Sequence, residues 1–259
     1  MNRTPWPGGE ILRDITRGGL AGLVVGIVVA GFGGRLAMRL AALVVPSASG
    51  AFTENGNRIG EVTVAGSAAL IIFAGLAAAV FLAAVWVAIS PWLPGRGVVR
   101  GLVAMPIAVA FGATALINAD NLDFVVLRHD PVVVAILLAL VAAMAPAMAV
   151  ADGWFDRRLP HAASVASPAG IVYAVLSAIG LALGSLLVFQ SIVGRQAQSV
   201  GITMLAAGLL TFGWWVQRLG GAAAPTRGLR IAGRTILVIG SGLGYANLAP
   251  ELAGALGLA

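Results

Sequence analysis

Long apolar runs separated by short polar segments make up most of the chain from residue 18 onward. A helix needs about 20 mostly apolar residues to cross the hydrocarbon core of a bilayer. Seven runs are of about that length: residues 18–45, 64–90, 98–117, 132–151, 168–193, 199–217 and 234–258. The pattern predicts an all-α fold, a polytopic integral membrane helix bundle with about seven transmembrane helices.

The segments between these runs are too short and too little biased in composition to mark a domain boundary. We therefore expect one transmembrane helical domain over residues 18–259. In residues 1–17, Ile11 and Ile15 alternate with charged side chains, which predicts a short amphipathic segment at the cytoplasmic membrane interface. Cleavage of the first 50 residues as a signal peptide is the alternative. The first apolar run, however, is longer than the apolar region of a usual signal peptide.

The composition also favours a bilayer as the partner of this chain. Hydrophobic residues make up 59% of it and charged residues only 10%, against about 25% charged in soluble domains. The net charge of +6 comes from scattered arginines without a basic patch, so a nucleic-acid partner is not expected. The chain has no lysine and no cysteine. The absence of lysine beside 16 arginines is typical of the codon usage of a GC-rich bacterial genome. Without cysteine, thiol catalysis and cysteine-ligated metals are excluded.

The arginines and tryptophans predict how the bundle is oriented. With the N-terminus inside, eleven of the 16 arginines fall on the inner side, in agreement with the positive-inside rule. Five tryptophans lie near the same boundary, where indole rings concentrate: Trp6, Trp92, Trp154, Trp214 and Trp215. We therefore predict a multi-pass protein of the bacterial cytoplasmic (cell) membrane with a cytoplasmic N-terminus.

Glycines recur at intervals of four or a multiple of four in the first and last apolar runs: Gly18, Gly22, Gly26 and Gly34, then Gly240 and Gly244. This spacing places them on one face of each helix. In lipid, small residues on such a face let helix backbones approach closely. The pattern predicts helix-packing surfaces, either within the bundle or between the copies of a homo-oligomer.

Two arginines, Arg35 and Arg39, lie within the first apolar run and share a helix face. Leaving Arg35 bare in hydrocarbon costs up to about 3 kcal/mol on insertion scales. Six of the ten acidic residues fall on the same, outer side of the predicted bundle. The candidate site consists of Arg35, Arg39, Glu54, Glu61, Asp120, Asp123 and Glu251, the last beyond a helix break expected at Pro250.

Three interpretations of this candidate site remain open. A buried ion-pair network would fix the register of the helices. An outer pocket would bind a small anionic or zwitterionic ligand, because the guanidinium group binds carboxylates and phosphates through two parallel hydrogen bonds. Alternatively, the arginines extend to the membrane interface without a partner.

Several chemistries lack the residues they require. No lysine is present to bind retinal, and His129 and His161 fall in loops on opposite sides, which disfavours haem. No membrane histidine is available to activate Ser241. We expect no metal and no cofactor, and no catalytic motif is present. The acidic and basic segment 152–161 is interpreted as a solvated cap on the fourth helix.

The sequence thus leaves three hypotheses about function. The first is a transporter or ligand-binding membrane protein with its polar site around the arginine pair. The second is a non-catalytic subunit that binds a membrane-complex partner. The third, for which the sequence offers only the carboxylates of Asp120 and Asp123, is an intramembrane lipid-modifying enzyme.

Overall fold

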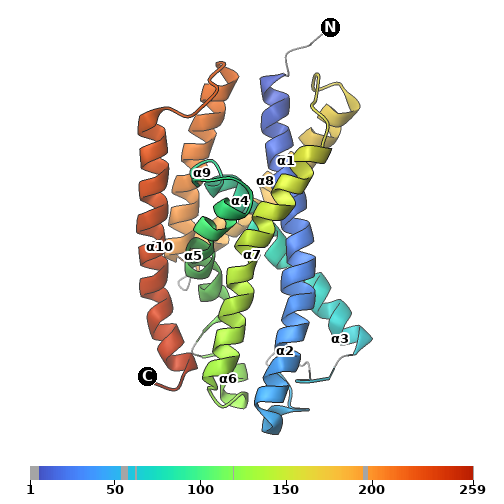
Figure 1. The fold of residues 1–259 in the computed structure, drawn as a ribbon, viewed down its shortest axis with the longest axis vertical. Coiled ribbons are helices and arrows are strands. Elements are labelled where there is room, and N and C mark those ends of the chain that lie inside the picture. Colours follow the sequence, from blue (N-terminus) through green and yellow to red (C-terminus); the bar gives the residue numbers. More distant parts are fainter. Residues whose placement is uncertain (1–5, 54–57, 62, 119, 195–197, 259) are drawn as a thin grey trace.

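The computed structural model describes residues 6–53, 58–61, 63–118, 120–194 and 198–258. The fold is 81% helical and has no strands in the described residues. Seven helices of this part are long and apolar enough to cross a bilayer, which confirms the predicted all-α multi-pass fold (Figure 1).

The first span consists of α1 (Pro7–Val25), the π-helical η1 (Gly26–Phe32) and α2 (Gly33–Val44); the second consists of α3 (Val64–Ala69), the π-helical η3 (Leu70–Gly75) and α4 (Leu76–Ile89). The other five are α5 (Gly97–Leu116), α7 (Pro131–Arg158), α8 (Pro168–Val193), α9 (Gln198–Leu219) and α10 (Arg227–Ala255). The short helices η2 (Pro46–Ala48) and α6 (Leu122–Val126) lie between spans.

The observed helices match the predicted runs in number and order, but three of them are longer. Residues 7–17 form the first turns of α1 and continue without interruption into the apolar part of the span. The helix predicted to end at residue 151 continues to Arg158. The helix predicted to begin at residue 234 begins at Arg227. In all three extensions charged side chains occupy helical positions, which an apolar pattern cannot detect.

The break expected near Pro250 is absent, because α10 runs continuously through this residue. A proline removes one backbone hydrogen bond, and membrane helices tolerate that loss where neighbouring helices supply compensating contacts. Close to it, the Asn247 amide donates a 2.7 Å hydrogen bond to the Ser199 hydroxyl of α9. The prediction of a broken last helix was therefore wrong.

The bundle core lies between α1, α4, α5, α7, α9 and α10, where Trp92, Phe111 and Met148 are fully buried. Around it, α1 packs against α4, α7 and α8, and α5 packs against α7 and α10. Large apolar side chains such as Phe73 and Val238 are 75% and 72% exposed. Apolar residues that face outward in this way fit a lipid environment.

The glycines of the first span lie against the second span. A Cβ at Gly22 would come within 2.6 Å of the Ala79 carbonyl oxygen, and one at Gly26 would overlap the Gly75 carbonyl. Contacts of this kind also occur in α10, where a Cβ at Gly244 would lie 2.7 Å from the carbonyl of Ala110. A Cβ at Gly18 would meet Val87, one at Gly34 would meet Leu70 and one at Gly240 would overlap Thr203. A homo-oligomer surface remains a prediction.

The turn between α4 and α5 is recessed from the end of the bundle at which α1 begins, which we call the N-terminal face. The Thr211 hydroxyl of α9 accepts a hydrogen bond from Trp92 Nε1 at 3.1 Å and donates one to the Ala88 carbonyl at 2.8 Å. Helix α9 continues from there to Leu219. At 1.5 Å per residue, these eight residues rise about 12 Å above the turn. Figure 1 shows the ends of α1, α9 and α10 above it.

Candidate functional site

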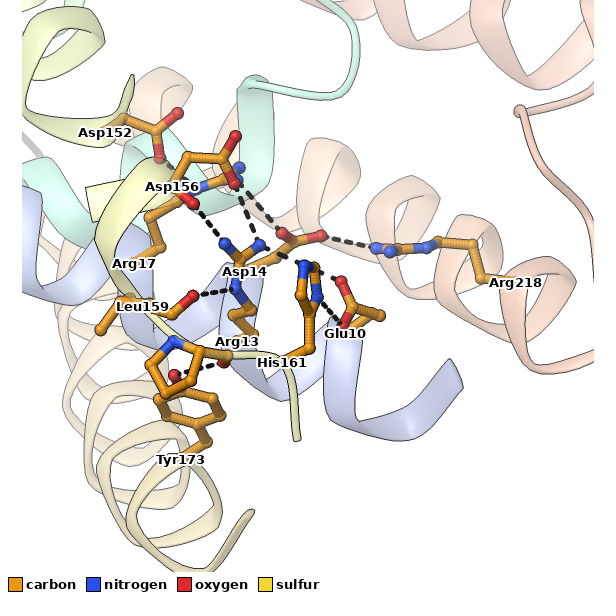
Figure 2. A network of polar contacts seen from close by, with 11 residues as sticks. Glu10, Arg13, Asp14, Arg17, Asp152, Asp156, Leu159, His161, Tyr173 and Arg218 are labelled. Carbon is orange, nitrogen blue, oxygen red and sulfur yellow. Dashed lines mark hydrogen bonds and ion pairs between the residues drawn. The ribbon is translucent and has the colours of Figure 1, made fainter. Parts of the chain in front are cut away.

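A ladder of ion pairs joins α1 to α7 at the N-terminal face (Figure 2). Arg13 and Arg17 are one turn apart on α1, and Asp152 and Asp156 are one turn apart on α7. Arg17 donates from Nε to Asp152 Oδ1 at 2.7 Å and from Nη1 to Asp156 Oδ1 at 2.6 Å. Arg13 Nη1 reaches the same Asp156 oxygen at 3.0 Å. The two pairs fix the register of α1 against α7.

Arg13 also caps the end of α7. Its Nη2 donates to the main-chain carbonyl of Asp156, and its Nε donates to the Leu159 carbonyl at 3.1 Å. The last carbonyls of a helix have no partner within the helix and carry partial negative charge. The buried guanidinium of Arg13 therefore meets both the acceptors and the charge of this helix end.

The network continues to two further elements. Asp14 lies between two arginines, with Arg17 at 3.4 Å and Arg218 of α9 at 2.6 Å. His161, in the α7–α8 connection, lies 2.7 Å from the carboxylate of Glu10. Figure 2 shows how these contacts converge on the first two turns of α1. Residues far apart in the sequence thus close one end of the bundle.

Directly beside this network is a cavity of about 130 Å³. Four residues from the end of α4 and the recessed turn, Trp86, Val87, Ser90 and Pro91, form part of its lining. The other lining residues include two acids, three arginines and two tryptophans: Asp14, Asp152, Arg17, Arg100, Arg218, Trp214 and Trp215. If all five charged groups are ionised, the lining has one excess positive charge.

Two hydrogen-bond donors in this lining have unused capacity. The side chain of Trp86 is buried, with 4% of the residue exposed, and its Nε1 has no hydrogen-bond partner among the described residues. The Asp152 carboxylate is nevertheless close enough to interact with this indole N–H, although the pair does not meet the geometric criteria for a hydrogen bond. Arg100 donates from Nε to the Gly95 carbonyl at 3.3 Å; its terminal nitrogens form no hydrogen bond with the described residues, and its charge acts on the Asp152 carboxylate.

These donors determine what the cavity can accommodate. An indole N–H and a guanidinium group only donate hydrogen bonds, so they require acceptor atoms on a bound group. Both Asp14 oxygens already contact arginines. With donors in excess and one surplus positive charge, the lining favours an oxyanion. Within the described residues, no three metal-ligating side chains come together.

The arginine pair predicted from the sequence lies at the opposite end of the bundle, the C-terminal face. Arg35 Nη2 donates to the Glu61 carbonyl at 2.7 Å, and Arg39 Nη1 donates to the Gly60 carbonyl at 3.0 Å. Both arginines therefore hold the loop before α3 against α2. Arg35 Nε is buried and has no hydrogen-bond partner in the described residues.

The acids predicted to accompany this arginine pair lie on different elements of the fold. The Glu61 side chain pairs with Arg58 at 3.2 Å, while Asp120 and Asp123 lie in the connection around the start of α6. Glu251 is near the end of α10, and Glu54 lies outside the described residues. The predicted ligand site around the arginine pair stays a prediction.

The polar network at the N-terminal face was missed because segment 152–161 was interpreted as a solvated cap. That interpretation was wrong for Asp152, which is 6% exposed and ion-paired inside the bundle. A usable signal exists in the sequence: two arginines and two aspartates, each pair spaced by four, lie on the same predicted side of the membrane.

Comparisons of this chain with protein-family models, with curated proteins and with solved structures gave no match.

Proposed function

We propose that this multi-pass membrane protein binds a small ligand through an anionic group, in the cavity at its N-terminal face, as a ligand-binding protein or transporter. One observation carries the proposal. The buried N–H of Trp86, with only the Asp152 carboxylate close to it, and the terminal nitrogens of Arg100 are in the same lining, and neither donor forms a hydrogen bond with the described residues. A buried donor without a partner costs about 1–3 kcal/mol, and a bound oxyanion would remove that cost.

The ion-pair ladder supports this proposal by keeping the lining in place. Arg17 is held by three aspartates and Arg218 by Asp14, so both of these cations are already neutralised. Arg100 is the remaining arginine of the lining and the main source of its excess charge. Binding should therefore depend on Arg100 more than on the other two arginines.

Thermal unfolding of the detergent-purified protein tests the proposal. Inorganic phosphate, acetate and glutamate are compared with sodium chloride at equal ionic strength, with unfolding followed by tryptophan fluorescence. We expect at least one oxyanion at ten times its Kd to raise the Tm by about 2 °C or more. Arg100→Gln should abolish the rise, whereas Arg96→Gln, an exposed arginine of the same turn, should retain it. Equal Tm values in all anions would contradict the proposal.

We also propose that the N-terminal face is cytoplasmic and that the host membrane is a bacterial cytoplasmic membrane, because of the arginine distribution. Without native cysteines, single ones can be introduced at exposed loop positions on either face, as Val165→Cys and Leu122→Cys. In intact cells, a membrane-impermeant maleimide should label only the cysteine at position 122. Labelling of position 165 alone would reverse the orientation.

A further inference from the structure

We infer that the anionic group bound in this cavity is the phosphate of a membrane lipid headgroup, an inference that rests on the proposed function. The structure supports it through the size of the cavity, the placement of its free donors and the apolar surface next to them.

The cavity is too small for a whole organic ligand of ordinary size. Its volume of about 130 Å³ is close to that of an engineered cavity, roughly 150 Å³, that binds benzene. Pockets for drug-sized molecules occupy about 300–1,000 Å³. A phosphate group with its ester oxygens fits the smaller volume. The rest of a larger molecule would have to lie outside the cavity.

The free donors come from the two helices that flank the recessed turn. Trp86 is in the last turn of α4, and Arg100 is in the first turn of α5, on either side of the recessed turn. A phosphate that accepts from both would have its negative charge next to the surplus positive charge of the lining. Asp152, which lies close to Trp86, repels any anion at this position, and a singly charged phosphodiester meets less of this repulsion than a doubly charged phosphate.

Apolar surface suited to an acyl chain begins beside Arg100. Val99 and Val103 flank it on α5 and are 59% and 38% exposed, while Gly101 packs against α7. Arg100 thus lies at the border between the cavity and the outward, apolar side of its helix. A lipid can place its phosphate on Arg100 and its chains along α5, which a free phosphate ester cannot do.

Binding measurements in detergent micelles distinguish lipid from soluble phosphate. The lipid probes are dioleoyl phosphatidylglycerol, dioleoyl phosphatidylcholine and dioleoylglycerol, which has no phosphate; the soluble probes are glycerol 3-phosphate and inorganic phosphate. Native mass spectrometry and tryptophan fluorescence report the Kd. We expect both phospholipids to bind, and dioleoylglycerol to bind at least about tenfold more weakly, since it lacks the charge-assisted hydrogen bonds.

Two substitutions and two matched controls locate the binding. Arg100→Gln should weaken phospholipid binding about tenfold or more, and Trp86→Phe, which removes the indole N–H together with the five-membered ring, should weaken it a few-fold. Arg96→Gln and Trp154→Phe change exposed residues outside the cavity lining and should leave the Kd unchanged. Equal Tm and helical content would verify that each variant is folded.

The outcomes separate this inference from the proposed function. If the soluble phosphates bind in an Arg100-dependent way and the phospholipids do not, the lipid inference fails and the proposed function stands. If phospholipid binding is as strong in Arg100→Gln as in Arg96→Gln, the lipids bind elsewhere and the inference is overturned. If no probe binds through Arg100, both proposals fail.

Discussion

Replacement of Arg17 by leucine is expected to lower the free energy of unfolding by about 3 kcal/mol or more. The Arg17 side chain is 17% exposed and pairs with Asp152, whose side chain is 9% exposed. Removing one partner of a buried ion pair leaves the other charge without compensation in a medium of low dielectric constant. Equilibrium unfolding of the purified protein in mixed detergent micelles would measure the loss.

The double variant Arg17→Leu/Asp152→Leu distinguishes an ion-pair effect from a packing effect. It removes both charges, while Asp156 keeps Arg13 and Asp14 keeps Arg218. We expect it to recover most of the stability, because apolar replacement of a whole buried pair is often neutral. Arg157→Leu, at an exposed position of α7, should cost less than about 0.5 kcal/mol. A double variant less stable than the single one would contradict this account of the ladder.

Gly26→Ala should be the most damaging of the conservative substitutions in the first span. The added Cβ would overlap the Gly75 carbonyl and come within 2.6 Å of the Ala79 nitrogen. Both contacts are with backbone, so the two spans must separate along their length. We expect a loss of about 3 kcal/mol in unfolding free energy, at the upper end of the usual range for overpacking.

Gly19→Ala provides the matched control, because nothing lies within 4 Å of the position of its Cβ. Alanine favours helix by up to about 1 kcal/mol relative to glycine, so this variant should be as stable as the native protein or slightly more stable. If Gly26→Ala and Gly19→Ala have the same unfolding midpoint, the first two spans do not pack as closely at Gly26 as these contacts require.

The length of the apolar runs predicted the seven spans because the bilayer imposes a length on each of them. It could not predict where α7 ends, since Asp152 and Asp156 are polar by composition and become part of the bundle only through Arg13 and Arg17 of another helix. Charged residues that pair between two helices can be recognised in the sequence only when their spacing on both helices is compared.

The candidate cavity was beyond the reach of sequence analysis for a related reason. Its lining combines Trp86 from the end of α4 with Arg100 from the start of α5, and these residues come near α9 only because the intervening turn is recessed. The depth of a turn depends on how far the neighbouring helices extend past it. That is a property of the packed bundle and not of any single segment.

The π-helical segment Gly26–Phe32 also has a consequence for how the first span presents its side chains. Such a segment accommodates an additional residue in its turn, so the helix after it is rotated relative to an uninterrupted α-helix. Gly34 consequently meets Leu70, and Gly33 approaches Leu140 of α7. The side chains of α2 are therefore rotated about the helix axis relative to the positions that a continuation of α1 would give them. A helical wheel drawn through all 38 residues from Pro7 to Val44 would leave out this rotation, and it would misplace the residues after Phe32, Arg35 and Arg39 among them, by the same angle.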